Sequence, residues 1–337
     1  MSARVLAAAA ALVPGLVAAP AALGDGVMPY AAQGGYGVLA PAAGHLGPTR
    51  YVAVGTTTTS STALEAIDAR DGSVQNYIDL PGNWGVPFVT WSAGGAGLST
   101  DGKTLVLGDV ATSYPRPTSR FLVLGVPSLR ARETIELKGD FAFDALSPDA
   151  SRLYLIQHVD ETNMARYVVR AYDLSARRLL PGRIADRTQR SWVMQGSPMA
   201  RAESGDGRWV YTLYSNPGGY PFVHALDTVR GVAHCVGLPW HGGQNGFYNL
   251  RLSLRDGGRT LAVHWLSGRR WLAVDTADWR VSPDRPGSGV WPFAALAAAV
   301  GAATLVGLAV LRRRRRRQEL EQELADLVRL AEREVVV

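Results

Sequence analysis

The side chains best suited to chemistry in this sequence are its single cysteine, its six histidines and a few carboxylates in polar segments. Cys235 follows His234, and an imidazole beside a thiol could bind a metal ion or form a nucleophilic pair. Successive residues of a strand point to opposite faces, so we do not expect these two side chains to meet. No H-E-x-x-H, G-x-S-x-G or phosphate-binding glycine pattern is present. The sequence therefore assigns no catalytic residue, no metal and no cofactor.

Three carboxylates leave an enzymatic alternative open. Asp144, Asp160 and Glu161 could supply the acid and the base of a hydrolase. Isolated carboxylates in loops are mostly solvated, however, and no motif pairs these three with a nucleophile. Whether the protein is an enzyme stays open at this point, with binding favoured over catalysis.

Aromatic and amide side chains form a second set of candidates, and their chemistry is recognition. They gather in long segments such as PGNWGVPF (81–88), DVATSYPRPTS (109–119) and PWHGGQNGFYN (239–249). Aromatic rings stack on sugars or peptides, while polar partners add directed hydrogen bonds. The alternative is that each ring packs between sheets and merely fills its loop. The candidate ligand-binding residues are Trp84, Tyr114, Arg190, Trp192, Tyr220, Trp240, His241, Gln244, Asn245 and Tyr248.

A repeat indicates which elements position these segments. The repeated unit is a tight Asp/Gly turn followed by an alternating apolar strand. Gly accepts a positive φ and Asp bonds to its own backbone, which explains why both recur in the turn. A further pair of strands follows each unit. The units are LSTDGKTLVLGD (98–109), LSPDASRLYLIQ (146–157), ESGDGRWVYTLY (203–214) and LSLRDGGRTLAVHW (252–265).

The period of the repeat predicts the fold class. Taking Tyr51, Leu105, Leu153, Val210 and Leu261 as equivalent gives spacings of 54, 48, 57 and 51 residues. A period near 50 with four short strands is typical of a propeller blade. We therefore predict an all-β fold, a β-propeller of about five four-stranded blades within 25–281. A β-sandwich is the alternative, and residues 25–46 could add part of a sixth blade.

The blade pattern also predicts two unlike faces. The short Asp/Gly turns join first to second and third to fourth strands, so the face that they form is expected to be structural. The long aromatic segments join second to third strands, or one blade to the next, and emerge on the opposite face. We call this the loop face and expect the ligand there.

Both ends of the chain carry apolar segments that indicate export and membrane insertion. Residues 1–24 have an early Arg4, an apolar run and small residues near Ala21, as in a secretory signal peptide, which could instead remain attached as an anchor. Residues 290–311 are 22 positions without a charge, enough for a helix to cross about 30 Å of hydrocarbon. Trp291 suits the membrane interface. We predict a transmembrane helix here, after a Pro/Gly linker at 282–289.

A basic cluster directly after this span predicts its orientation. The chain has 35 Lys and Arg against 29 Asp and Glu, and without the six clustered arginines the balance is 29 to 29. The high pI thus reflects one segment, and nucleic-acid binding is not expected. By the positive-inside rule we expect a single-pass cell-membrane protein, with its N-terminal domain extracellular and its C-terminus cytoplasmic. The cluster is Arg312, Arg313, Arg314, Arg315, Arg316 and Arg317.

The residues after the arginines predict a short cytoplasmic helix. Leu320, Leu324, Leu327 and Ala331 follow a 4-3-4 spacing that places them on one stripe. This helix, within the tail 312–337, could pair with another copy or bind a cytoplasmic partner.

The repeat strings themselves support the fold prediction by resemblance. LSPDASRLYL and LSTDGKTLVL resemble the S-P-D-G-x-x-L motif of TolB-like and YVTN-type bacterial propellers, which are WD-repeat-like. The resemblance covers the exported region repeat by repeat and implies a propeller architecture. It implies no site residue, because related propellers bind proteins, bind small molecules or catalyse reactions. The YVTN tetrapeptide is absent, and a membrane segment replaces the soluble periplasmic arrangement of TolB.

These patterns together favour one function over two others. We expect a membrane-anchored, non-catalytic binding or scaffolding module whose loop face takes an extracellular protein, peptide or glycan. The alternatives are an exported hydrolase or lactonase with a pocket at the propeller axis, and a signal relay through the tail.

Overall fold

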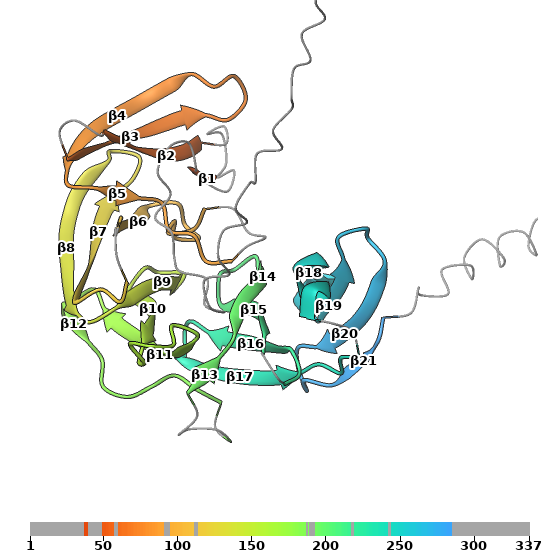
Figure 1. The fold of residues 1–337 in the computed structure, drawn as a ribbon. Coiled ribbons are helices and arrows are strands. Elements are labelled where there is room, and N and C mark those ends of the chain that lie inside the picture. The colour runs from red at the N-terminus through yellow and green to blue at the C-terminus, as the bar shows by residue number, and fades with distance from the viewer. Residues whose placement is uncertain are drawn as a thin grey trace, which may run out of the picture. The chain divides into compact units, whose positions relative to one another are not determined.

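The structure, a computed structural model, describes residues 37–39, 49–56, 60–90, 95–110, 114–186, 188, 193–216, 219–241 and 244–284. In this part of the chain the fold is all-β, with five antiparallel sheets and no α-helix (Figure 1). The prediction of an all-β chain with five repeated sheets is thereby confirmed. The predicted signal peptide (1–24), the transmembrane helix (290–311) with Trp291, and the tail (312–337) with its six arginines lie outside the described residues. Among the described residues, no helix is both long and apolar enough to span a membrane.

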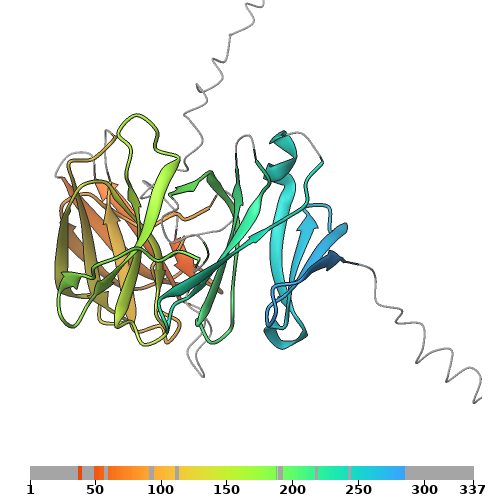
Figure 2. The same cartoon turned by 90° about the horizontal axis from the view of Figure 1, so that it is seen from below.

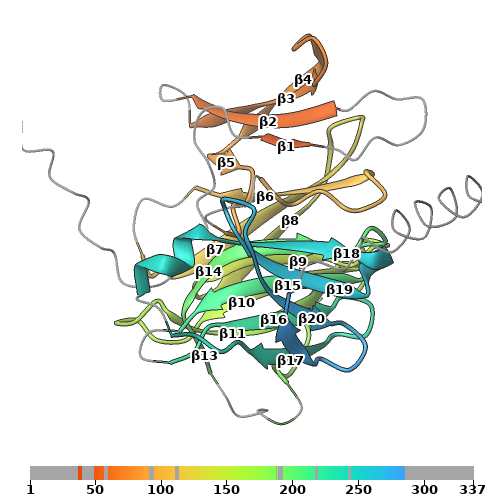
Figure 3. The ribbon, with the colours of Figure 1, turned by 90° about the vertical axis from the view of Figure 1, so that its right-hand side faces the viewer.

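Each sheet is a meander whose strands are adjacent in the chain, as β1–β4 illustrate in Figure 3. The first sheet contains β1 (Gly37–Leu39), β2 (Thr49–Thr56), β3 (Ser61–Asp68) and β4 (Val74–Pro81). The second contains β5 (Trp84–Gly85), β6 (Thr104–Asp109), β7 (Thr118–Gly125) and β8 (Arg130–Lys138). The third contains β9 (Phe141–Leu146), β10 (Arg152–His158), β11 (Arg166–Asp173) and β12 (Arg178–Leu179), and β13 (Met194–Gln195) also pairs with β11.

The last two sheets complete the described fold. The fourth contains β14 (Ser197–Glu203), β15 (Trp209–Ser215), β16 (Phe222–Asp227) and β17 (Val232–Gly237). The fifth contains β18 (Leu250–Arg255), β19 (Thr260–Trp265), β20 (Arg270–Asp275) and β21 (Val281–Pro283). Two short 3-10 helices precede and interrupt the fifth sheet, η2 (Gln244–Asn249) and η3 (Asp256–Gly258).

The repeat predicted from the sequence matches the strands. The five positions taken as equivalent fall in the second strand of each sheet, and all five side chains are buried. Gly37–Leu39, within the segment that could have started a sixth blade, pair with β2 and belong to the first sheet. The strand alternation thus places one side of each second strand in an apolar core.

The turns between first and second strands owe their repetition to a local hydrogen-bond pattern. In three sheets a serine hydroxyl donates to the carboxylate of the aspartate two residues later, at 2.5 to 2.6 Å. The same aspartate oxygen accepts a backbone N–H, and the serine oxygen accepts the first N–H of the next strand. The turn is therefore closed by its own side chains. The pairs are Ser99 and Asp101, Ser147 and Asp149, and Ser204 and Asp206.

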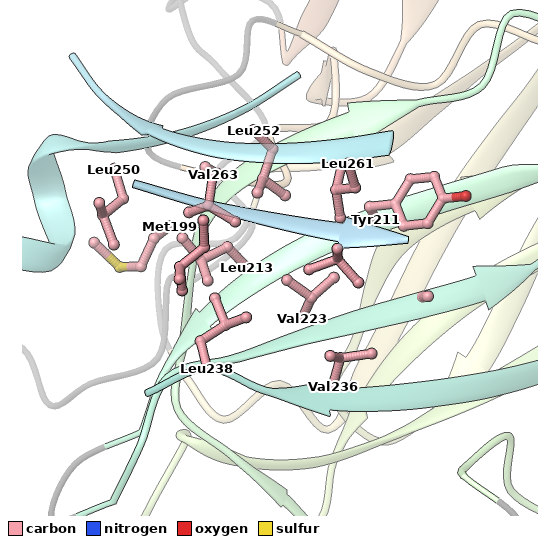
Figure 4. Close-up of a cluster of buried hydrophobic side chains, with 14 of the residues drawn as sticks. Met199, Tyr211, Leu213, Val223, Val236, Leu238, Leu250, Leu252, Leu261 and Val263 are labelled. Atoms are coloured by element: carbon pink, nitrogen blue, oxygen red, sulfur yellow. The ribbon is translucent and has the colours of Figure 1, made fainter. Parts of the chain in front are cut away.

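Successive sheets pack face to face through apolar side chains, in the order of the colours in Figures 1 and 2. Figure 4 shows the cluster between the fourth and fifth sheets, where Leu213 and Val223 meet Leu252 and Val263. Apolar burial of this kind contributes roughly 25 cal/mol per Å². The four junctions between neighbouring sheets hold the strand ends, and hence the loops, in fixed positions.

Candidate functional site

Part of one segment predicted for the loop face, 109–119, lies at the junction of the second and third sheets. The β6–β7 loop, the β8–β9 link and the β10–β11 loop all leave the same end of these antiparallel sheets. Together they line a groove of about 590 Å³, which we call the interblade groove. Its lining comes from Pro115, Arg116 and Pro117, from residues 138–140 and from residues 157–161.

A buried arginine joins the loops that form the groove. Arg116, whose side chain is 7% exposed, bonds through Nη1 to Asp109 Oδ1 at 3.0 Å and through Nε to Asp140 Oδ1 at 2.9 Å. Its Nη2 donates to the carbonyl of Phe141, and its backbone N–H donates to Asp140 Oδ2 at 3.1 Å. A buried guanidinium with two carboxylates and a carbonyl is well satisfied, so it fixes three chain segments at once.

The floor of the groove pairs a histidine with one of these carboxylates. His158 Nδ1 lies 3.6 Å from Asp140 Oδ1, and the His158 side chain is 5% exposed. Burial alone would raise the pKa of Asp140, but His158 and Arg116 outweigh it and hold that pKa below its usual value. Asp140 is therefore an anion at neutral pH, hydrogen-bonded to Arg116 and near the His158 ring.

The rim of the groove contains both apolar and charged side chains. Val159 is 43% exposed, and Pro115 and Pro117 are exposed beside it. Lys138 and Glu161 add one charge of each sign at the surface. Apolar side chains together with charges of both signs at the rim suit a peptide segment, whose side chains need apolar contacts and ion pairs.

Two of the carboxylates named from sequence lie at or near this groove, and one does not. Glu161 lies on the rim, while Asp160 is bonded to Arg166 Nη1 at 3.0 Å and to the Thr162 hydroxyl at 2.8 Å. Those bonds lower the pKa of Asp160, the Thr162 hydroxyl contributing most. Asp144 is not in a loop but in β9, where its side chain is 3% exposed.

The ten candidate ligand residues are distributed over several places. Tyr114 adjoins the groove, with the Arg116 guanidinium 5.6 Å from its ring centroid. Trp84 is buried, donates from Nε1 to the carbonyl of Pro81 at 2.7 Å and lies under Arg120. Trp240 is partly buried, with its ring 4.5 Å from that of Phe247.

The other candidates divide into exposed side chains and those not described. Tyr220 and Tyr248 are 62% and 58% exposed, and His241 is exposed as well. Gln244 and Asn245 belong to η2, but their side chains are outside the described residues, as are Arg190 and Trp192 entirely. Of the six candidates whose side chains are described, none lines the groove, and Tyr114 adjoins it through Arg116.

The side chain of Cys235 contacts a histidine other than His234, its neighbour in the sequence. Cys235 faces His224 across the β16–β17 pair, with Sγ 3.6 Å from Nδ1. Burial raises the pKa of the Cys235 thiol to about 12 and lowers the pKa of His224 to about 4. Both groups are neutral at pH 7, so the pair lacks the thiolate of a nucleophile. His234 instead stacks on Trp279, with ring centroids 4.7 Å apart.

Sequence reasoning missed Arg116, Asp140 and His158 as a group. The segment 109–119 was expected on the loop face, but Asp140 comes from a short link and is 24 residues from Arg116. A usable signal was the arginine between two prolines in YPRPT, because a rigid flank leaves such a side chain a fixed direction.

Comparison with known proteins gives structural likenesses only. No protein-family model and no curated protein matches the sequence. The propeller of Dos1 matches 72% of this chain and 57% of its own, with 9% identity and a TM-score of 0.40. TolB of Acinetobacter baumannii matches 69% and 52%, with 11% identity and a TM-score of 0.37. A puromycin-hydrolyzing peptidase of Mycobacterium tuberculosis matches 74% and 36%, with 20% identity and a TM-score of 0.41.

The chain spans less than two thirds of the length of each of these structures. Every TM-score is below 0.5, so no activity, ligand or partner of those proteins is transferred to this chain.

Proposed function

We propose that this chain is an exported, membrane-anchored propeller of the TolB-like kind that binds an extracellular protein or peptide segment, without catalysis, in the interblade groove. The observation that carries the proposal is the groove itself, a volume of about 590 Å³ held open by the buried Arg116 between Asp109 and Asp140. Such a rigid, loop-built recess is the usual location of recognition on a repeated scaffold.

A peptide fits the groove better than a glycan does. The rim offers Pro115, Pro117 and Val159, which contact aliphatic side chains, and the described lining contains no Phe, Tyr or Trp ring on which a sugar could stack. The exposed tyrosines Tyr220 and Tyr248 are outside the groove lining. We therefore commit to a protein or peptide ligand.

Membrane attachment is part of the same proposal. The uncharged span 290–311 and the arginines 312–317 would hold the groove outside the cell and the tail inside. Relay to a cytoplasmic partner through the tail remains an addition to binding rather than a substitute for it.

The test uses two matched valines on opposite ends of the sheets. A photoreactive phenylalanine analogue replaces Val159 at the groove or Val229 in the β16–β17 turn, which are 43% and 53% exposed. In intact cells the full chain is expected to cross-link a discrete protein from position 159 and none from position 229. Charge reversal by Glu161→Lys together with Lys138→Glu should reduce the yield from position 159 several-fold, because the rim then repels the same ligand.

Two results would contradict the proposal. Equal cross-linking from both valines would mean that the groove has no role. Turnover of an ester or lactone by the full chain, abolished by Asp144→Asn or Asp160→Asn with folding intact, would favour the hydrolase instead.

A further inference from the structure

A second cavity lies at the opposite end of the sheets from the interblade groove. Its volume is about 360 Å³, and it lies between β9 and the end of β14, below two of the Asp/Gly turns. Residues 95–100 of the second sheet and residues 204–207 of the fourth sheet line its sides. We call it the turn-side cavity. The sequence predicted this face to be structural.

One wall of the turn-side cavity carries a buried guanidinium. The Arg201 side chain is 6% exposed and bonds through Nη1 to Asp144 Oδ1 at 3.2 Å. Its Nη2 donates to the carbonyl of Asp144 at 2.8 Å. Because Asp144 belongs to β9 of the neighbouring sheet and is 3% exposed, these bonds fix one side of Arg201 permanently.

The other side of Arg201 has a partner of a different kind. Arg201 Nε bonds to Glu203 Oε1 at 2.7 Å, and the Glu203 side chain is 50% exposed. Glu203 follows on the same strand and is itself part of the cavity lining. A half-exposed carboxylate can turn into water at little cost, whereas a buried guanidinium needs an anion beside it. Glu203 therefore occupies a position that another carboxylate could take.

The remainder of the lining combines apolar side chains with the hydroxyl groups and backbone of the two turns. Leu98, Phe143, Leu146 and Val210 face the cavity. The turns above it are held in contact, because a Cβ on Gly207 would overlap the Thr100 hydroxyl. A ligand that enters needs a small apolar body for these walls and one carboxylate for Arg201.

We propose that the turn-side cavity binds a small apolar monocarboxylate, whose carboxylate displaces Glu203 from Arg201 while its body packs against Phe143 and Leu98. The site is independent of the interblade groove and of its proposed peptide ligand. Burial raises the pKa of Asp144, and the charge and hydrogen bond of Arg201 oppose this rise.

The test measures binding of two probes that differ only in charge. Fluorobenzoate and fluorobenzamide are titrated with the full chain in lipid nanodiscs and followed by fluorine NMR, with empty nanodiscs as the blank. The fluorobenzoate signal is expected to broaden and the fluorobenzamide signal is not. Glu203→Gln should tighten fluorobenzoate binding about tenfold if Glu203 blocks the site nine tenths of the time.

Further variants establish whether fluorobenzoate binds in the turn-side cavity. Arg201→Gln should weaken fluorobenzoate binding at least about tenfold, because the charge-assisted bonds are lost. Glu161→Gln, in the interblade groove, should leave it unchanged. Equal broadening of both probes, or an unchanged fluorobenzoate affinity in Glu203→Gln, would overturn the proposal. The Glu203→Gln test does not depend on whether Arg201→Gln folds.

Discussion

His224 shows what a single buried side chain does to the stability of this protein. Its side chain is buried in β16, its Nε2 has no hydrogen-bond partner in the described part of the chain, and its pKa is lowered to about 4 from 6.5 by burial. Between these two pH values the unfolded chain binds a proton that the folded chain does not. The free energy of unfolding therefore falls as the pH falls from about 6.5 to about 4.

This linkage predicts the effect of removing the imidazole. Through His224 the free energy of unfolding falls by about 3 kcal/mol over this pH range, since one pKa unit corresponds to about 1.4 kcal/mol. We expect His224→Phe to lose less stability than the parent chain between pH 7 and pH 4, in urea unfolding followed by tryptophan fluorescence. His241→Gln is the control, because it also removes an imidazole and that side chain is exposed. An identical pH dependence in His224→Phe and the parent would rule out this role.

Ala150 is a second residue whose local conformation makes a prediction. It has φ of +51°, where the equivalent turns of the second and fourth sheets have Gly102 and Gly207. An L residue in this region is strained by about 1 kcal/mol, and glycine removes this strain. Glycine also makes the unfolded chain more flexible, which cancels part of the stability gained. We expect Ala150→Gly to raise the free energy of unfolding by about 0.5 kcal/mol in the same assay. A decrease would mean that the alanine methyl group has a packing role.

At the scale of the element, the Asp/Gly turns have one backbone shape but different surroundings. Gly102 has φ of +67° with nothing within 4 Å of an added Cβ, whereas Gly207 has φ of +70° and would overlap Thr100. Gly102→Ala should therefore cost only the net backbone effect, about 0.5 kcal/mol, as the reverse of Ala150→Gly. Gly207→Ala should cost about 2 kcal/mol more, because two turns must separate. Thermal unfolding of both variants measures the difference, and equal losses would show that the turn contact is not rigid.

The same contrast explains how far the sequence predicts this fold. The blades could be predicted because each turn closes within about five residues, so its chemistry repeats in the sequence as a short string. Ser147 and Asp149, for example, bond to each other and to the two residues that follow the turn. The second strand of each sheet could be predicted directly from these repeated turn sequences.

The candidate sites could be predicted only in part, because their contacts join distant segments. Tyr114 was placed on the loop face and adjoins the groove, but Trp84, assigned in the same way, is buried against its own loop. Asp144 and Arg201 are 57 residues apart and belong to different sheets. Nothing in either local segment specifies that pairing, which arises when the sheets stack.

At the scale of the whole molecule, the proposed topology places Val229 outside the cell and Val337 inside. The only native cysteine is a suitable background for labelling, because burial raises the pKa of Cys235 to about 12 and leaves little thiolate to react. Val229, in an exposed turn, and Val337, at the end of the tail, can each be replaced by cysteine in the full chain.

A membrane-impermeant maleimide then reports the orientation of the span in intact cells. We expect Val229→Cys to be labelled before lysis and Val337→Cys only after it. Replacing arginines 312–317 with glutamine should raise the fraction of chains labelled at position 337 before lysis, because the positive charges that favour the cytoplasmic side are lost. The parent arginines should leave that fraction near zero. Labelling of Val337→Cys in intact cells with the arginines present would place the tail outside, and the groove could then no longer be assigned to the extracellular face by the charge of this segment.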